Sequence, residues 1–538
     1  MKNFKFLLHW MICILILFAS NLWGAGNKPL CEYSYIDLEV LCGGAAGVNI
    51  HAKDALRLCP PIITVLRIGK PEQWNENLLR PVHMLMEYFK KHGKLPRTPY
   101  DKNLREYVTA MDAPLLAVTA QMAYERTHDK RYKSYVDMLI EYCLLHADRG
   151  GFLLPLGDSA VWPLEYSWKS VTEKDAWFVL NGSLYGAVCL KLLECVTQNP
   201  KLKELNKKIV EAYEKKVQHF MYKDKQYCWY SLNYRDKRPI INQIIKMIIE
   251  IRASKALYRL SGEKVYLQIF EERTNLLKEI FPVYIVHDKG NTAGVLFRAA
   301  APHPYLVDIY PNRLEFLDEK GSIVTSAYTK TRLVDECMIW QPLNKNVVSY
   351  RLYGQVSHTP LPPTLLAEAK VKHIDIKDIQ LTPAQGKWIF SGDARMQNGA
   401  LAVNPKFSRY LQANLIFRFD KPVKLDNNSY IVIEVNNPSA HKYLSSIILY
   451  TENGHVLQRS GIPVSPGKNL QIYSAIGFKN YPDSLSPVRR INFRLITNKL
   501  KSEEYIKLGK IYVFTSPVAL AVYLKNKKFR TYWNLVSD

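Results

Sequence analysis

The chain has 538 residues, of which 48% are apolar, and it carries a formal net charge of +24. This length excludes a single hydrophobic core, so two or three domains are expected, and the composition is that of an ordinary globular protein. The positive charge favours an anionic partner, which could be nucleic acid, anionic lipid or acidic polysaccharide. The alternative is a lysine-rich surface without a partner, and the scattered lysines of "KLKELNKK" and "KNKKFR" agree with it.

The N-terminus has the pattern of a secretory signal peptide over residues 1–25. Lys2 and Lys5 precede an apolar run, and small residues follow at Gly24 and Ala25. An uncleaved anchor is the alternative, because Trp23 stands where a small residue is preferred. No later stretch approaches the roughly 20 apolar residues of a spanning helix. We therefore expect a secreted or periplasmic protein with no membrane span after cleavage, which favours acidic polysaccharide and not nucleic acid as the partner.

The sequence of residues 26–285 predicts paired helices. Apolar-periodic segments are separated by polar turns at His128, Gln198 and Gly262, which recur at similar spacing. Helical hairpins that stack side by side bury the apolar stripes that none could bury alone. The pattern predicts an α/α-toroid, with a helical bundle as the alternative.

The following sequence consists of short runs in which apolar and polar residues alternate, a pattern that predicts β-strands. We expect a small β-rich region over 286–358 with a turn at 319–321, and a proline-containing linker over 359–369. Residues 370–538 are predicted to form a C-terminal β-sandwich with a hairpin at Asn453 and Gly454, and to be a candidate carbohydrate-binding module.

The side chains that could take part in catalysis or sugar binding are concentrated in residues 152–243. The sequence contains no glycine-rich phosphate loop, no G-x-S-x-G and no H-E-x-x-H, so nucleotide and zinc-protease functions are excluded, and neither a cofactor nor a metal is expected. Trp162, Glu165 and Tyr166 put aromatic rings beside a carboxylate, which suits a sugar platform. The alternative is a buried aromatic collar. Helical cysteines are predicted to be buried thiols; they are Cys143, Cys189, Cys195 and Cys228.

The order of the motifs resembles the C-terminal catalytic domain of the D-glucuronyl C5-epimerases over about residues 90–285. The matching pieces are "WPLEY", "VLNG" at the start of a helix, "WYSLN" and "INQ". The resemblance implies an α/α-toroid that converts glucuronate to iduronate within a heparan-type polymer. It places Asn181, Gly182 and Tyr185 on the V-L-N-G helix, Tyr230 on a family tyrosine, and Asn242 with Gln243 on an amide pair.

This sequence departs from the family at Ser231 and Tyr234, which replace an aspartate and a histidine, and "RDKRPI" stands where a further tyrosine is found. C5 deprotonation of a uronate needs a base near C5 and cations or donors at the carboxylate. The candidate acid/base residues are Tyr185, Tyr230 and Glu165. The candidate substrate-binding residues are Trp162, Tyr166, Asn181, Tyr234, Arg235, Arg238, Asn242 and Gln243.

The leading interpretation is a cofactor-free uronate C5-epimerase-like enzyme that acts on an acidic polysaccharide. An epimerase needs acid/base groups on both faces of the sugar ring, whereas a lyase needs one face and a leaving-group acid. The missing tyrosine therefore keeps a uronate polysaccharide lyase and a non-catalytic glycan-binding protein open. The oligomeric state also stays open, with a homodimer among the alternatives.

Overall fold

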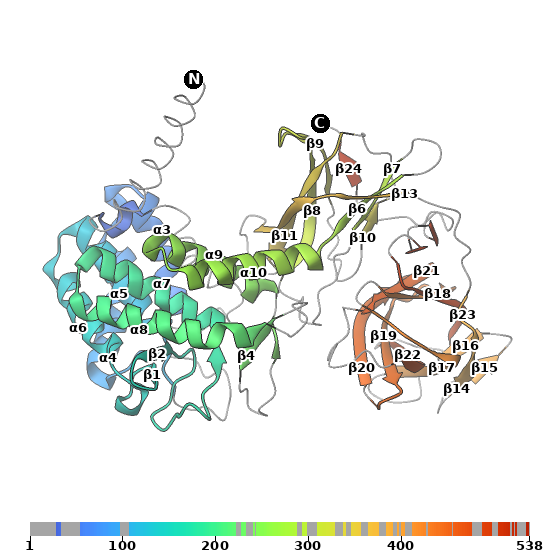
Figure 1. Ribbon diagram of the computed structural model, residues 1–538, viewed down its shortest axis with the longest axis horizontal. Helices are drawn as coiled ribbons and strands as arrows, with labels where there is room; N and C mark the ends of the chain where they lie inside the picture. Colours follow the sequence, from blue (N-terminus) through green and yellow to red (C-terminus); the bar gives the residue numbers. More distant parts are fainter. Residues whose placement is uncertain are drawn as a thin grey trace, which may run out of the picture. The chain divides into compact units, whose positions relative to one another are not determined.

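The computed structural model divides the chain into two compact units, Met1–Leu276 and Leu277–Asp538 (Figure 1). The first is mainly helical and the second consists mainly of strands, which confirms the predicted mixture of α and β structure. The structure describes residues 28–33, 54–96, 107–221, 228–232, 240–242, 244–287, 293–297, 309–328, 337–339, 346–356, 364–375, 383–390, 395–397, 400–403, 411–426, 429–454, 456–475, 487–497, 504–516, 519–520, 522–523 and 534–536.

The predicted signal peptide lies outside the described residues. None of the described helices is both long and apolar enough to cross a membrane. The helices of the first unit are α3 (Ala55–Ile68), α4 (Glu76–His92), α5 (Asp112–Thr127), α6 (Lys130–Cys143), α7 (Leu180–Thr197), α8 (Pro200–Lys216) and α9 (Ile244–Ser261), followed by α10 (Lys264–Ile280), which begins in this unit and ends after Leu277. Short 3₁₀ helices are η2 (Leu30–Glu32), η3 (Pro71–Gln73), η4 (Ala147–Arg149) and η5 (Val217–Phe220).

The turns inside three helix pairs follow from local chemistry. His128, Gln198 and Gly262 follow α5, α7 and α9 in the left-handed conformation, with φ angles of 57°, 52° and 75°. Their N–H groups bond to carbonyls four residues earlier, which ends each helix. Asp129 and Asn199 then cap the next helix with side-chain oxygens that accept from backbone N–H groups. The three predicted turns are confirmed.

The helices of this unit form an inner and an outer row. Every residue of α5 from Asp112 to Ala123 is buried, as is every residue of α7 from Leu180 to Leu190. In contrast, α4, α6 and α8 bury one stripe and expose the other. Contacts run from α3 to α5, from α5 to α7 and from α7 to α9, while α4, α6 and α8 each pack on the helix before them (Figure 1).

Two small sheets accompany these helices. Strands β1 (Leu153–Leu156) and β2 (Ala160–Pro163) form an antiparallel hairpin. Strands β3 (Phe178–Val179), β4 (Trp229–Leu232) and β5 (Ile240–Ile241) form a sheet in the order β3-β4-β5. Because β3 runs directly into α7, this second sheet brings β4 to the N-terminus of that helix.

The second unit begins with two sheets. One has the order β10-β7-β6-β13 and contains β6 (Val283–His287), β7 (Ala293–Phe297), β10 (Cys337–Ile339) and β13 (Lys372–Asp375). The other has the order β12-β11-β8-β9-β24 and contains β8 (Ile309–Leu317), β9 (Ile323–Tyr328), β11 (Ser349–Val356), β12 (Thr364–Lys370) and β24 (Asn534–Val536). The predicted turn at 319–321 joins β8 to β9, with Gly321 at a φ of 79°.

The predicted linker and the boundary after it are wrong. Residues from Thr364 onward form β12, which is antiparallel to β11 with Ala367 opposite Leu352. Strand β13 pairs with β6, and β24 near the chain end pairs with β9. The extended backbone that successive prolines favour also suits a strand, and Leu366 with Ala367 provides buried side chains for one. Residues on both sides of 376–533 therefore share these two sheets.

Two five-stranded sheets make up the remainder. The first has the order β14-β17-β22-β19-β20, with β14 (Gly386–Phe390), β17 (Leu411–Val423), β19 (Tyr443–Thr451), β20 (Val456–Val464) and β22 (Val488–Thr497). The second has the order β15-β16-β23-β18-β21, with β15 (Arg395–Gln397), β16 (Ala400–Val403), β18 (Tyr430–Asn437), β21 (Gly467–Ser474) and β23 (Glu504–Phe514). One core, to which both contribute, includes Phe417, Ile433, Phe493 and Ile511. Gly454, at a φ of 83°, forms the predicted hairpin turn between β19 and β20.

Candidate active site

Glu165 is a buried carboxylate at the N-terminus of α7. Its neighbours in the chain are fixed by backbone hydrogen bonds, from Leu164 to Phe152 and between Ser167 and Val108. Its side chain lies against Gly182, where an added Cβ would come within 2.6 Å of the Glu165 Cδ atom and still closer to Oε2. The glycine of the V-L-N-G stretch therefore makes room for this carboxylate.

The Glu165 carboxylate lies at the N-terminal end of helix α7. Gly182 belongs to the first turn of the helix, whose N–H groups have no partner within the helix and whose dipole attracts anions. Glu165 is only 4% exposed, and its Oε2 atom has no hydrogen-bond partner among the described residues. The carboxylate is thus held in place by packing and by the helix field, with one oxygen left for a further donor.

Tyr230 connects this carboxylate to the surface. The ladder between β3 and β4 puts Ser231 opposite Val179, so Tyr230 lies close to the first turn of α7. Its hydroxyl donates to Glu165 Oε1 over 3.4 Å, which is a long hydrogen bond. Tyr230 is half-buried and not sealed in the core, as the sequence predicts.

Tyr166 completes the group as a neutral donor. Its hydroxyl interacts with both Tyr230 and Glu165, and burial, helped by the negative charge of Glu165, raises the pKa of Tyr166 well above its usual 10. Tyr166 therefore stays protonated at any physiological pH. It is almost fully buried, so its predicted role as a sugar platform is wrong, and it supports the other two residues instead.

An aromatic wall backs Tyr230. Tyr166 packs against Tyr107 and Trp177 at ring-centroid distances of 5.4 and 5.5 Å, and Trp168 packs edge-on against Trp177 at 6.0 Å. Sequence analysis missed Tyr107, because the bridge between Val108 and Ser167 that brings it here joins residues far apart in the chain. Trp177 could have been found from its place just before V-L-N-G.

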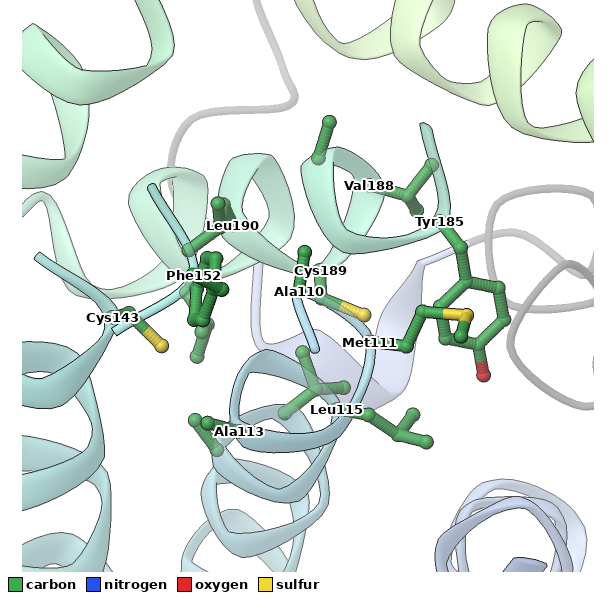
Figure 2. Packing of buried hydrophobic residues seen from close by; sticks show 14 of the residues in the cluster. Ala110, Met111, Ala113, Leu115, Cys143, Phe152, Tyr185, Val188, Cys189 and Leu190 are labelled. Carbon is green, nitrogen blue, oxygen red and sulfur yellow. The ribbon is translucent and has the colours of Figure 1, made fainter. Parts of the chain in front are cut away.

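Two predicted site residues are core residues. Trp162 is fully buried, with Phe220 stacked on it and with Phe178 and Tyr213 edge-on, so it cannot offer a sugar platform and the alternative of a buried aromatic collar holds for it. Tyr185 is 1% exposed and lies beside Met111 in the main core (Figure 2). Its predicted role as an acid/base group in contact with a polymer is therefore wrong. Both residues lie on elements whose every side is buried.

Asn242 belongs to a buried polar network and not to a substrate surface. Its Nδ2 donates to Glu250 Oε1 over 2.7 Å, and its backbone N–H donates to the Cys228 carbonyl over 2.8 Å. Glu250 in turn pairs with Arg273, Nε to Oε2, at 2.7 Å, and both side chains are fully buried. Cys228 precedes β4 and Asn242 follows β5, so this network anchors both ends of the segment that carries Tyr230.

Charge in this network is balanced by the buried ion pair. Burial raises the pKa of Glu250 above its usual range, against the lowering effect of Arg273. Burial also raises the pKa of the Cys228 thiol to about 12. The predicted buried thiols are confirmed, since Cys143, Cys189, Cys195 and Cys228 are all buried and form no disulfide with a described residue. Figure 2 shows Cys143 and Cys189 among the apolar side chains around Phe152.

The other predicted residues divide into two groups. Asn181, the second residue of α7, is buried beside Gly182, and its Oδ1 has no hydrogen-bond partner among the described residues. The remaining candidates lie outside the described residues, and their substrate-binding roles stay predictions; they are Tyr234, Arg235, Arg238 and Gln243.

Residues 98–275 match the family model of the D-glucuronyl C5-epimerase C-terminus. The resemblance predicted from the motifs is thereby confirmed for this part of the chain, which we call the epimerase-like region. It includes Glu165, the V-L-N-G stretch and Tyr230, and it supports a carbohydrate-active enzyme. No curated protein matches the sequence.

Solved structures give only weak similarities. An α-1,6-mannanase of glycoside hydrolase family 76 from Salegentibacter sp. HEL1_6 is 17% identical over 45% of this chain and 69% of its own, with a TM-score of 0.28. A family 76 α-mannanase from Bacteroides thetaiotaomicron is 10% identical over 48% and 63%, with a TM-score of 0.30. An agarase is 14% identical over 24% of each chain, with a TM-score of 0.19. Scores of this size do not establish a shared fold.

Proposed function

We propose that the protein is an exported uronate C5-epimerase-like enzyme that acts on an acidic polysaccharide. The observation that supports this most directly is that the hydroxyl of half-buried Tyr230 is directed at the buried carboxylate of Glu165 within the epimerase-like region. In this proposal the inner and outer helix rows of the first unit belong to an α/α-toroid. The two sheets that share a core in the second unit would form the β-sandwich.

In the proposed reaction, Tyr230 is the catalytic residue and Glu165 its positioning partner. The C5–H bond of the uronate breaks, its proton moves to the Tyr230 oxygen, and the phenolic proton of Tyr230 moves to Glu165 Oε1. The electron pair is delocalised into the substrate carboxylate, where donors must stabilise it. Glu165 is too deeply buried to touch a polymer itself, so it acts through the tyrosine.

Return of a proton to the opposite ring face completes an epimerisation without loss of atoms. Tyr185 is too buried to supply this proton, so a further acid/base group is required on that face. The substrate carboxylate would be bound by Arg235 and Arg238, with Tyr234 as a further substrate-binding residue. These three residues lie outside the described part of the chain.

A uronate lyase is the second candidate, and the burial of Tyr185 favours it. A lyase also breaks the C5–H bond but then expels the C4 substituent, so it requires proton abstraction on one face only. The pair of Tyr230 and Glu165 would suffice for that step. A non-catalytic glycan-binding protein is the third hypothesis, in which this site binds a polysaccharide without turnover.

Incubation with heparosan, alginate and pectin in deuterated water separates the three functions. Deuterium at C5 without chain cleavage supports the epimerase, and absorbance from a new C4–C5 double bond supports the lyase. Retention of a polymer without either change would contradict both enzymatic functions.

A further inference from the structure

The outer face of the sheet β14-β17-β22-β19-β20 is distinguished by its charge. Phe417, Phe493 and Leu449 point to the core that this sheet shares with its partner sheet. Because side chains alternate along a strand, the residues next to them point to the opposite face. That outer face therefore presents Arg418 of β17 and Arg490 of β22.

A row of cations crosses this face in register. Lys387 of β14 is opposite Arg418, Arg418 is opposite Arg490, and Arg490 is opposite Tyr450 of β19. Neighbouring strands lie about 4.8 Å apart, and like charges directly opposite each other destabilise a sheet. None of the three cations forms an ion pair with any described residue. Among the described residues of this sheet, no ion pair offsets their repulsion.

The row is also pre-organised. The guanidinium of Arg490 lies over the Tyr450 ring, 4.1 Å from its centroid, which restricts the side chain to one place before a ligand arrives. Further along the same strands, hydrogen-bonding atoms of Ser446, Asn492 and Arg494 are buried without a partner among the described residues. In folded proteins such atoms usually have a partner in the protein or in ordered water.

We propose that this cationic row, Lys387, Arg418 and Arg490 with Tyr450, binds an acidic polysaccharide chain. Planar guanidinium groups bind carboxylates through two parallel hydrogen bonds, and several carboxylates in sequence would meet several cations at once. The choice of a uronate polymer as the ligand rests on the proposed function, whereas the charge of the surface does not. Binding here would retain the polymer near the enzyme and raise its effective concentration.

Single-stranded nucleic acid is the competing polyanion, and the row suits it less well. Non-specific nucleic-acid surfaces combine cations with aromatic rings on which bases stack. In this row one face of the Tyr450 ring is already covered by Arg490. The observations therefore favour a carboxylate polymer, which requires ion pairing more than stacking.

The test compares two double variants of the full chain, each of which removes two positive charges. Lys387→Ala/Arg418→Ala removes two exposed cations of the row. Arg489→Ala/Lys468→Ala removes an exposed arginine that is paired with Glu452 at 3.3 Å and an exposed lysine on β21 of the partner sheet. Affinity for fluorescently labelled alginate at low salt should fall about five- to tenfold in the first variant and less than about twofold in the second.

The other outcomes of this experiment test the site and its ligand separately. Equal losses in both variants, or no alginate binding by the natural chain, would overturn the proposed site. Equally tight binding of single-stranded DNA that is lost in the same variant would overturn the glycan assignment. If binding persists while no uronate polymer is turned over, the proposed function fails and the binding surface stands.

Discussion

The α-carbon of Gly182 lies directly against the carboxylate of Glu165, so a side chain at position 182 would occupy the space that the carboxylate fills. A carboxylate and a helix N-terminus thus meet at the one residue type that permits their close approach. The other oxygen of the same carboxylate, Oε1, accepts from the hydroxyl of Tyr230 on β4.

Gly182→Ala should destabilise the protein by about 1–3 kcal/mol, because the new Cβ would displace the Glu165 carboxylate. In a Glu165→Ala background the same substitution should stabilise by up to about 1 kcal/mol, since alanine has the higher helix propensity. Chemical denaturation of the four proteins of this cycle measures the coupling. Additive effects would contradict the contact.

Arg273→Met should cost about 3–5 kcal/mol, because it leaves the carboxylate of Glu250 buried without its partner. Adding Glu250→Gln should recover about 2 kcal/mol, since an amide is cheaper to bury and still accepts from Asn242. Lys133→Met is the matched control: it breaks an exposed ion pair with Asp137 of the same 2.7 Å length and should cost less than about 1 kcal/mol. If Arg273→Met and Lys133→Met lowered stability by similar amounts, this interpretation of the network would be contradicted.

Stability should fall as the pH rises above 9. Burial raises the pKa of both the Cys59 and the Cys228 thiols from 9.0 to about 12. Between these values the unfolded thiols have lost their protons and the folded ones have not, so the folded state binds more protons. Each thiol then lowers stability by about 1.4 kcal/mol per pH unit.

Urea denaturation between pH 8 and 10.5 measures this slope. Cys59→Ala and Cys228→Ala should each make it shallower. Rapid reaction of the native thiols with a disulfide reagent at pH 8 would show instead that they are accessible and would sink this prediction.

Residues 383–523 should fold as an isolated fragment. Their two sheets share one core, and Tyr523 packs on Tyr512 at 4.6 Å and donates to Glu434 over 2.8 Å, which covers the other face of the second sheet. Circular dichroism and thermal melting test this. Tyr523→Ala in the fragment should cost about 3 kcal/mol, because it empties a buried aromatic site. A fragment without cooperative melting would contradict the boundary.

The sequence predicts those parts of the structure that local interactions determine by themselves. The turns at His128, Gln198 and Gly262 need only a left-handed residue and a polar cap, and Asn453 with Gly454 needs only a hairpin signal. The motif order that indicated the epimerase-like region is also local. Glu165, Tyr166 and Tyr230 are therefore among the site residues that the sequence predicts, although it predicts no contact between them.

Side-chain direction was not readable in the same way. Helix α7 is buried on every side at its start, so periodicity could not tell whether Tyr185 faces a cavity or the core. Asn242 binds Glu250 and, through it, Arg273, a pairing between two helices that no short motif encodes. The return of β12 and β24 to earlier strands likewise depends on pairing between distant segments.

The measurement that tests the central claim most directly is deuterium incorporation at C5 of a uronate polymer, followed by NMR, for the natural chain and two variants. Tyr230→Phe removes the proposed proton carrier and should lower incorporation by roughly 10² to 10⁴ while changing stability little. Tyr124→Phe removes a hydroxyl from a half-buried tyrosine near the end of α5 and should retain full incorporation. Full incorporation by Tyr230→Phe would contradict the tyrosine mechanism.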